Sequence, residues 1–443
     1  MKIYRIFCLL ISLMMLFLFV CCAQNNAEEG VLISADNVSG DFIYSIYSGN
    51  TVTITGYTGS EQILVIPDKI DTRPVTAIAA NAFADQNQIK YLTIGKYVRT
   101  IGNSAFAGCE ALCELELGGK IRSVGDYAFA SCISLTRVEV GDSIQTLGYG
   151  VFSSCVSLCE AIIGDGVLAL PDAAFSGCSS LLNVYLGDRI GTVGNEAFYQ
   201  CESLLNVHFG SAVETICPRA FAYCSGLIEI ELGGKIADVG EEAFFHCTQL
   251  ERVSLGKSLR RVGSGAFYAC IALRTLEGGE KIQHLGYSVF EETPWLSAQT
   301  EEFVTIGQGI LLRYTGQGGE VRIPDGILTI TDAFCNSDSL TSVVISDSVV
   351  SIGDYAFYGC PALTAVTFGK RVETIGVSAF SDCGVLTQLR LPGSLRKIGA
   401  NAFKNCSALS IVSYPNSEKK FGEIVIADGN SSLTGAVISY KTS

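Results

Sequence analysis

Cysteine is the most reactive residue type that recurs in this sequence, and its spacing favours packing over chemistry. Eighteen cysteines among 443 residues would ordinarily indicate a disulfide scaffold in an exported chain. Neighbours in a repeat column lie about 4.8 Å apart with parallel side chains, whereas a disulfide needs Cβ atoms that converge. We therefore expect unpaired, buried thiols that fill space as small apolar groups. The cysteines that share one repeat position are Cys109, Cys132, Cys155, Cys178, Cys201, Cys224, Cys247, Cys270, Cys360, Cys383 and Cys406.

Metal binding and catalysis find little support in the remaining reactive residues. Two C-x-x-x-C pairs occur, Cys109/Cys113 and Cys155/Cys159, without a histidine at ligand spacing. The three histidines occupy different repeat positions: His208, His246 and His284. No nucleophile elbow, phosphate-binding loop, dinucleotide-binding glycine motif or H-E-x-x-H motif is present. The sequence thus predicts no metal site, no cofactor and no enzymatic activity.

Composition narrows the class of partner. Hydrophobic residues make up 48% and charged residues 17% of the chain, which is enough apolar material for a continuous core. The formal net charge is −14. Because an acidic surface repels phosphate backbones, we expect no nucleic-acid partner.

The first 23 residues have the pattern of a leader for export. Lys2 and Arg5 precede the apolar run 6–20, which is shorter than the ~20 residues of a membrane span. Cleavage after Ala23 would release the protein. Alternatively, residues 18–21 resemble a lipobox, in which Cys21 would carry a lipid, and an uncleaved leader would also anchor the chain. Each alternative predicts a secreted or cell-surface protein whose membrane contact is confined to its N-terminus.

A 23-residue repeat organises the rest of the chain. Its consensus is A-F-x-x-C-x-x-L-x-x-V-x-L-G-x-x-V-x-x-I-G-x-x, and we number positions from the phenylalanine as 0. Apolar residues alternate at +9 and +11, which indicates a short strand with one buried face. Glycine at +12 predicts a turn that needs backbone freedom, and the spacing 0, +3, +6 predicts a tight turn or 3₁₀ segment. The fourteen phenylalanines are Phe83, Phe106, Phe129, Phe152, Phe175, Phe198, Phe221, Phe244, Phe267, Phe290, Phe334, Phe357, Phe380 and Phe403.

One strand and one turn in each 23-residue unit predict a repeat solenoid made of leucine-rich-repeat coils with parallel strands. The repeat resembles the BspA-type leucine-rich repeats of bacterial and protozoan surface proteins, from about residue 40 to the end. The resemblance implies a surface or secreted protein, and some members of that family bind host matrix proteins or mediate adhesion.

Two arrays and three caps are expected along the chain. The segment 40–67 predicts an N-terminal β-hairpin cap around Gly49-Asn50, before a ten-repeat array at 68–290. In the segment 291–326, Leu311, 314–316 and 323–324 repeat the offsets of Ile54, 57–59 and 66–67, so we interpret it as an internal second copy of that cap. A four-repeat array at 327–410 and a C-terminal cap at 411–443 would follow, since terminal coils need polar outer faces.

A binding site is expected on the sheet face, where positions +8 and +10 point away from the core. Glu114, Arg137 and Glu160 alternate in sign at +8, which is as consistent with mutual stabilisation as with binding. In the middle of the ten-repeat array the same positions form an uncharged, partly aromatic patch, a composition shared by ordinary strands and by interface hot spots. The candidate patch is Ile162, Asn183, Tyr185, Asn206 and His208, bordered by Glu160, Glu229 and Glu231.

The favoured function is binding of an extracellular protein, with host matrix as one such partner. The alternative is a glycan-binding or structural role in the cell envelope, because exposed tyrosine and asparagine on a flat sheet also suit sugars.

Overall fold

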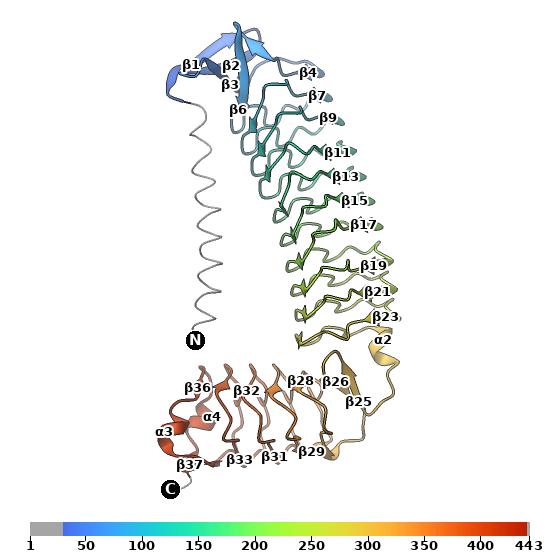
Figure 1. Cartoon of the computed structure of the whole chain (residues 1–443), viewed down its shortest axis with the longest axis vertical. Helices are drawn as coiled ribbons and strands as arrows, with labels where there is room; N and C mark the ends of the chain where they lie inside the picture. Colours follow the sequence, from blue (N-terminus) through green and yellow to red (C-terminus); the bar gives the residue numbers. More distant parts are fainter. Residues whose placement is uncertain (1–29, 441–443) are drawn as a thin grey trace. The chain divides into compact units, whose positions relative to one another are not determined.

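A computed structural model describes residues 30–440 of the chain. Two compact units are present, unit 1 (Met1–Val167) and unit 2 (Leu168–Ser443). Figure 1 colours the chain by residue number, so the residues of each unit can be located in it. The expected leader and Cys21 lie outside the described residues. Among residues 30–440, no helix is both long and apolar enough to cross a membrane. Both units are parallel-strand solenoids with a 23-residue repeat, as the sequence predicts.

Unit 1 begins with antiparallel strands and continues as repeat coils. β1 (Leu32–Ser39), β2 (Phe42–Tyr47) and β3 (Thr51–Tyr57) pair in order, and β5 (Lys69–Ile70) pairs with β6 (Arg73–Ile78). β2 and β3 form an antiparallel hairpin within the segment 40–67, where a cap is predicted, whereas β1 was not indicated by the sequence pattern. The sheet face of unit 1 is formed by β4 (Ile63–Val65), β7 (Tyr91–Thr93), β9 (Glu114–Glu116), β11 (Arg137–Val140) and β13 (Glu160–Ile163).

Unit 2 repeats this plan in two arrays. The sheet face of its first array is formed by β15 (Asn183–Leu186), β17 (Asn206–His208), β19 (Glu229–Glu231), β21 (Arg252–Leu255) and β23 (Thr275–Gly278). Between the arrays lie α2 (Pro294–Ser297), β25 (Phe303–Ile306) and β26 (Ile310–Tyr314). The second array continues with β27 (Gly319–Arg322), β29 (Leu340–Val344), β31 (Ala365–Thr367), β33 (Gln388–Arg390), β35 (Ile411–Tyr414) and β37 (Val437–Tyr440).

Each coil also contains a second strand that the sequence analysis did not identify. It has two residues, at positions +17 and +18 in every such strand except 329–330 and 425–426, and it is too short for alternation to be visible in the sequence. In unit 1 these strands are β8 (Thr100–Ile101), β10 (Ser123–Val124) and β12 (Thr146–Leu147). In unit 2 they are β14 (Ala169–Leu170), β16 (Thr192–Val193), β18 (Thr215–Ile216), β20 (Asp238–Val239), β22 (Arg261–Val262), β24 (His284–Leu285), β28 (Thr329–Ile330), β30 (Ser351–Ile352), β32 (Thr374–Ile375), β34 (Lys397–Ile398) and β36 (Val425–Ile426).

The segment around each phenylalanine consists of turns that are hydrogen-bonded to the next coil. Residues at −2 and +2 adopt left-handed backbone conformations, as at Ser104 (φ 52°) and Gly108 (φ 70°). The amides of Ser104, Phe106 and Gly108 donate to the carbonyls of Asp126, Ala128 and Ala130, each at 2.8 Å. These donations satisfy the backbone amides on this side of the coil, which is hydrogen-bonded to its neighbour without a helix or a strand.

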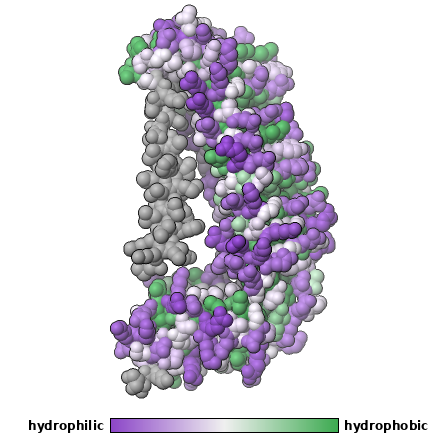
Figure 2. Space-filling model, viewed as in Figure 1, coloured by the Kyte–Doolittle hydropathy of each residue, from purple (hydrophilic) through white to green (hydrophobic). Residues whose placement is uncertain are grey.

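The core is a column of stacked phenylalanine rings. Phe106 and Phe129 are fully buried, and their ring planes are parallel at a centroid distance of 5.3 Å. A similar hairpin closes the first coil of each array: Tyr57 packs against Phe83 with tilted rings at 5.5 Å, and Tyr314 stacks against Phe334 at 4.8 Å. This repetition explains why the residue offsets of the two segments match in the sequence. On the face in view, hydrophilic side chains predominate and apolar ones are scattered between coils (Figure 2).

At Gly95 and Gly118, the glycine at +12 has a different physical reason from the one expected, whereas Gly279 has the expected positive φ (89°). Gly95 and Gly118 do not have positive φ values, so no special backbone freedom is required there. A Cβ atom on Gly95 would lie 2.7 Å from the carbonyl oxygen of Ile66, and one on Gly118 would lie 2.9 Å from that of Ile94. Glycine is therefore needed because the preceding coil approaches closely, which a single-sequence turn interpretation does not reveal.

Within unit 2, the two arrays contact each other through the half-buried carboxylate of Asp332. Asp332 of the second array accepts hydrogen bonds from the amide (2.8 Å) and hydroxyl (3.1 Å) of Ser288 in the first array. Tyr287 and Tyr355 pack edge to face beside it at 4.9 Å. Burial raises the pKa of Asp332, and it also raises the pKa of the neighbouring Glu291, with a further contribution from the charge of Asp332.

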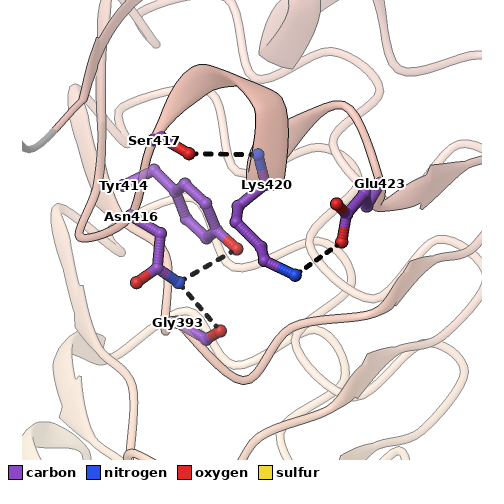
Figure 3. A network of polar contacts seen from close by, with 6 residues as sticks. All are labelled: Gly393, Tyr414, Asn416, Ser417, Lys420 and Glu423. Atoms are coloured by element: carbon purple, nitrogen blue, oxygen red, sulfur yellow. Dashed lines mark hydrogen bonds and ion pairs between the residues drawn. The ribbon is translucent and has the colours of Figure 1, made fainter.

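Two single-turn helices and a polar network close the C-terminus. The helices α3 (Glu418–Phe421) and α4 (Ser431–Thr434) flank β36. Figure 3 shows the network beside α3, in which the Asn416 amide donates to the Gly393 carbonyl at 3.2 Å. Ser417 caps α3 by accepting from the amide of Lys420, whose ammonium contacts Glu423 at 2.8 Å. These polar groups lie on the last coil of the described residues.

Candidate functional site

The candidate patch lies on the sheet face, but its residues divide between the two units. Glu160 and Ile162 are half-buried on β13 of unit 1. Asn183 is half-buried on β15 of unit 2, and the Tyr185 side chain on the same strand is 38% exposed. The remaining residues are exposed on β17 and β19 of unit 2: Asn206, His208, Glu229 and Glu231.

In unit 2, the parallel register of β15 and β17 joins four patch residues into two pairs. Asn183 lies opposite Asn206, and Tyr185 lies opposite His208. The side-chain amide nitrogen of Asn206 (Nδ2) donates to the side-chain oxygen of Asn183 (Oδ1) at 2.8 Å. The rings of Tyr185 and His208 are parallel within 5°, with centroids 4.5 Å apart. The pairs order four side chains on the surface before any partner arrives, which reduces the entropy that binding would cost.

A groove of about 410 Å³ begins at His208 and runs toward β23. This volume lies within the roughly 300–1,000 Å³ usual for ligand sites. Four patch residues line the groove, but Tyr185 does not. Sequence analysis did not identify the other charged and polar residues of this "unit 2 groove". Its lining is Leu205, Asn206, Val207, His208, Glu229, Ile230, Glu231, Arg252, Val253, Ser254, Thr275 and Glu277.

A second groove, of about 700 Å³, lies on the sheet face of unit 1. This "unit 1 groove" lies over β7, β9 and β11, where no site was expected beyond the alternating charges at +8. Its lining is Tyr91, Leu92, Thr93, Cys113, Glu114, Leu115, Glu116, Leu117, Thr136, Arg137, Glu139 and Gly141.

Each groove lies where the sheet is interrupted. β4, β7 and β9 form one sheet and β11 belongs to the next, while β17 and β19 likewise belong to different sheets. At both interruptions the +9 side chain is only half-buried: Leu115 on β9 and Val207 on β17. Most other +9 side chains are fully buried, such as Val138 (1% exposed) and Val184 (0%). Each interruption therefore opens an apolar floor to solvent.

The groove rims are acidic, with one arginine each. Arg252 pairs with Glu229, a contact that raises the pKa of Arg252. Arg137 contacts Glu160 at 2.7 Å and Glu139 at 3.3 Å. Of the alternating charges at +8, Arg137 and Glu160 form an ion pair, and no ion pair joins Arg137 to Glu114 among the described residues. Arg137 and Arg252 are therefore both in ion pairs with glutamates on the same sheet face.

The column of cysteines contributes packing and hydrogen bonds. Thiols of the column donate to the backbone carbonyl of a phenylalanine in the preceding coil; Cys109, for example, donates to Phe83 at 3.2 Å. Burial raises the pKa of the Cys109 thiol to about 12, so the thiolate needed for nucleophilic chemistry is disfavoured. Between residues 30 and 440, no three His, Cys, Asp or Glu side chains lie close enough to hold a metal ion.

Comparison with protein families decides the classification. The model of the BspA type leucine rich repeat region matches residues 76–204, 169–297 and 320–442, which is most of the chain. The chain belongs to the BspA-type leucine-rich-repeat family. A comparison of this BspA-type protein with curated proteins found no match.

Several solved leucine-rich-repeat proteins resemble the BspA-type chain. A protein from Bacteroides ovatus is 22% identical (92% of this chain, 100% of that one, TM-score 0.46). A leucine rich cell surface protein from Faecalibacterium prausnitzii is 24% identical (93% and 96%, TM-score 0.38). A leucine rich repeat protein of T. pallidum is 27% identical (48% and 90%, TM-score 0.41). At these TM-scores the likenesses carry no argument about the site, and the family assignment rests on the repeat itself.

Proposed function

We propose that this protein is a secreted or cell-surface binding protein that recognises an extracellular protein through its sheet face, in adhesion to a host or a neighbouring cell. The observation that carries the proposal is the preordered stack of Tyr185 and His208 beside the unit 2 groove. Aromatic side chains framed by charged groups are typical of the residues that dominate binding energy at interfaces. Export to the surface is proposed from the leader-like pattern of residues 1–23, and one structural relative is described as a cell surface protein.

Binding is favoured over catalysis because the buried thiols are poor nucleophiles and the exposed groups of the sheet face form shallow grooves. A glycan remains the alternative ligand of the same stack, since parallel ring pairs with flanking amides also suit the faces and hydroxyls of sugars. The two ligand classes make different predictions in a screen.

The test is a binding screen of residues 24–443 against extracellular matrix proteins and a glycan array. We expect a protein ligand, and we expect Tyr185→Ala/His208→Ala to weaken its binding by at least about 2 kcal/mol, the usual loss at a central anchor. The matched control is Tyr149→Ala/His284→Ala, which removes an exposed tyrosine and an exposed histidine elsewhere on the coils. Equal losses in both variants, or binding confined to glycans, would contradict the proposal.

A further inference from the structure

The two grooves are copies of one arrangement. The sequence Glu114-Leu115-Glu116 is followed by Leu-Gly-Gly-Lys, and so is Glu229-Ile230-Glu231, 115 residues or five repeats later. The next coil supplies Arg137 in unit 1 and Arg252 in unit 2, again 115 residues apart. The 23-residue repeat alone does not require this recurrence, because other coils have neither the paired glutamates nor the arginine at these positions.

The physical elements of the grooves also correspond. Each has an interrupted sheet, a half-exposed aliphatic side chain at its floor, and glutamates at +8 and +10 on its rim. The interruption follows the glutamate strand β9 in unit 1 and precedes the glutamate strand β19 in unit 2, so the half-exposed side chain lies on β9 in one groove and on β17 in the other. An interruption exposes apolar surface to water and removes ladder hydrogen bonds, both of which cost stability. Its occurrence beside the same glutamate pair in both units indicates that the grooves serve a common ligand.

The carboxylates that form no ion pair within the protein define the chemistry of that ligand. Arg252 forms an ion pair with Glu229, and the charge of Glu277 acts on Arg252 without forming an ion pair with it. Glu231 forms no ion pair among residues 30–440. In the unit 1 groove, Arg137 is held by Glu139 and Glu160, while Glu114 has no cationic partner among the described residues. Both grooves therefore present uncompensated carboxylates around an apolar floor. A group that complements such a surface carries positive charge at the end of an aliphatic stem.

We propose that each groove binds an extended peptide segment bearing lysine or arginine side chains. The aliphatic stems cover Leu115 or Val207, and the cationic ends form charge-assisted hydrogen bonds with Glu114 and Glu116, or with Glu231 and Glu277. This inference rests on the proposed function for the unit 2 groove and names the chemistry of its partner. It also assigns a second site, in unit 1, where the sequence indicated none.

The test uses hexalysine as the probe, with calorimetry for stoichiometry and anisotropy of a fluorescein-labelled peptide for affinity. We expect two sites per chain, one site in Glu231→Gln/Glu277→Gln, one in Glu114→Gln/Glu116→Gln, and loss of about tenfold or more in affinity when all four are changed. Affinity should fall as salt rises. The control, Glu202→Gln/Glu214→Gln, makes the same charge change at exposed positions outside both grooves and should bind like the parent.

Equal binding by the control and the groove variants would show general attraction to an acidic protein and would overturn the inference. Failure of hexalysine to bind, or a single site unaffected by the unit 1 variant, would overturn it as well. The proposed function is tested separately by Tyr185 and His208 against natural ligands. A protein ligand that depends on those two residues while hexalysine fails would leave the proposed function standing and remove only this inference. Thermal melting of each variant establishes that all are folded.

Discussion

Removing one ring from the phenylalanine column should destabilise the solenoid far more than removing an exposed ring from the sheet face. Phe198 is fully buried and stacks on Phe175 (5.5 Å) and Phe221 (5.1 Å). Burial of a phenylalanine contributes about 1.5–3 kcal/mol, and each stacked pair adds about 0.5–1.5 kcal/mol. The sum agrees with the ~3–5 kcal/mol measured for Phe→Ala in protein cores. We expect Phe198→Ala to lower the free energy of unfolding by about 4 kcal/mol.

Urea unfolding measures this loss with two probes. Trp295, the single tryptophan, packs 5.0 Å from Phe290 at the end of the same array and reports its tertiary structure by fluorescence. Far-UV circular dichroism reports the coils as a whole. Tyr185→Ala serves as the control and should change stability by less than about 1 kcal/mol, because its ring is partly exposed and stacks on one neighbour. A loss below about 1 kcal/mol for Phe198→Ala would refute the continuous stack.

Four further outcomes are expected. Gly263→Ala should lower the melting temperature sharply, because a Cβ atom there would lie 2.6 Å from the carbonyl carbon of Gly240; an unchanged melt would contradict the close approach of adjacent coils. Iodoacetamide at pH 8 should modify the exposed Cys159 in the native protein and spare Cys109, as peptide mass spectrometry can establish; rapid labelling of Cys109 would argue against a buried column. Burial raises the pKa of Asp332, so the folded state binds more protons and stability should fall as pH rises from the unfolded carboxyl's range near 4 through the higher folded-state pKa. Asp332→Asn should flatten this decline in urea titrations at pH 4, 5.5 and 7, and an unaltered slope would count against it. If Cys21 is lipidated, the mature chain should begin there and fractionate with membranes, whereas an N-terminus at Gln24 in the soluble fraction would establish plain secretion.

The periodic part of the fold could be predicted because one physical requirement recurs in every coil. Phe106 and Phe129 must meet ring to ring, Cys132 must fit beside them, and Val138 must face inward, so the same residue types return every 23 residues. A single sequence then contains fourteen observations of the same environment. The hairpin caps were recognisable for the same reason, since Tyr57 and Tyr314 perform the same closing contact in two places.

Features that depend on contact between neighbouring coils could not be predicted in this way. The two-residue strands, such as β8, are defined by their partners in adjacent coils and have no period of their own. The requirement for glycine at Gly95 comes from the carbonyl of Ile66, 29 residues away. β1 has an irregular pairing with β2 and exposes Leu32 and Ile33, so its sequence shows no buried alternation.

The candidate site was likewise predictable from the sequence only in part. Tyr185 and His208 stood out in the sequence because they interrupt the run of charged residues at +10, and the structure stacks them. Arg252 and Glu277 did not stand out, because charged residues at these positions are common along the array. They become part of a groove only through the separation of β17 from β19, which changes the exposure of Val207 without changing its residue type. In a solenoid, a functional surface can be marked by unusual residue types or by an interrupted hydrogen-bond ladder, and the two can occur independently. The motif E-[LI]-E-L-G-G-K occurs beside both interruptions of the ladder, and this recurrence is the one trace of them in the sequence.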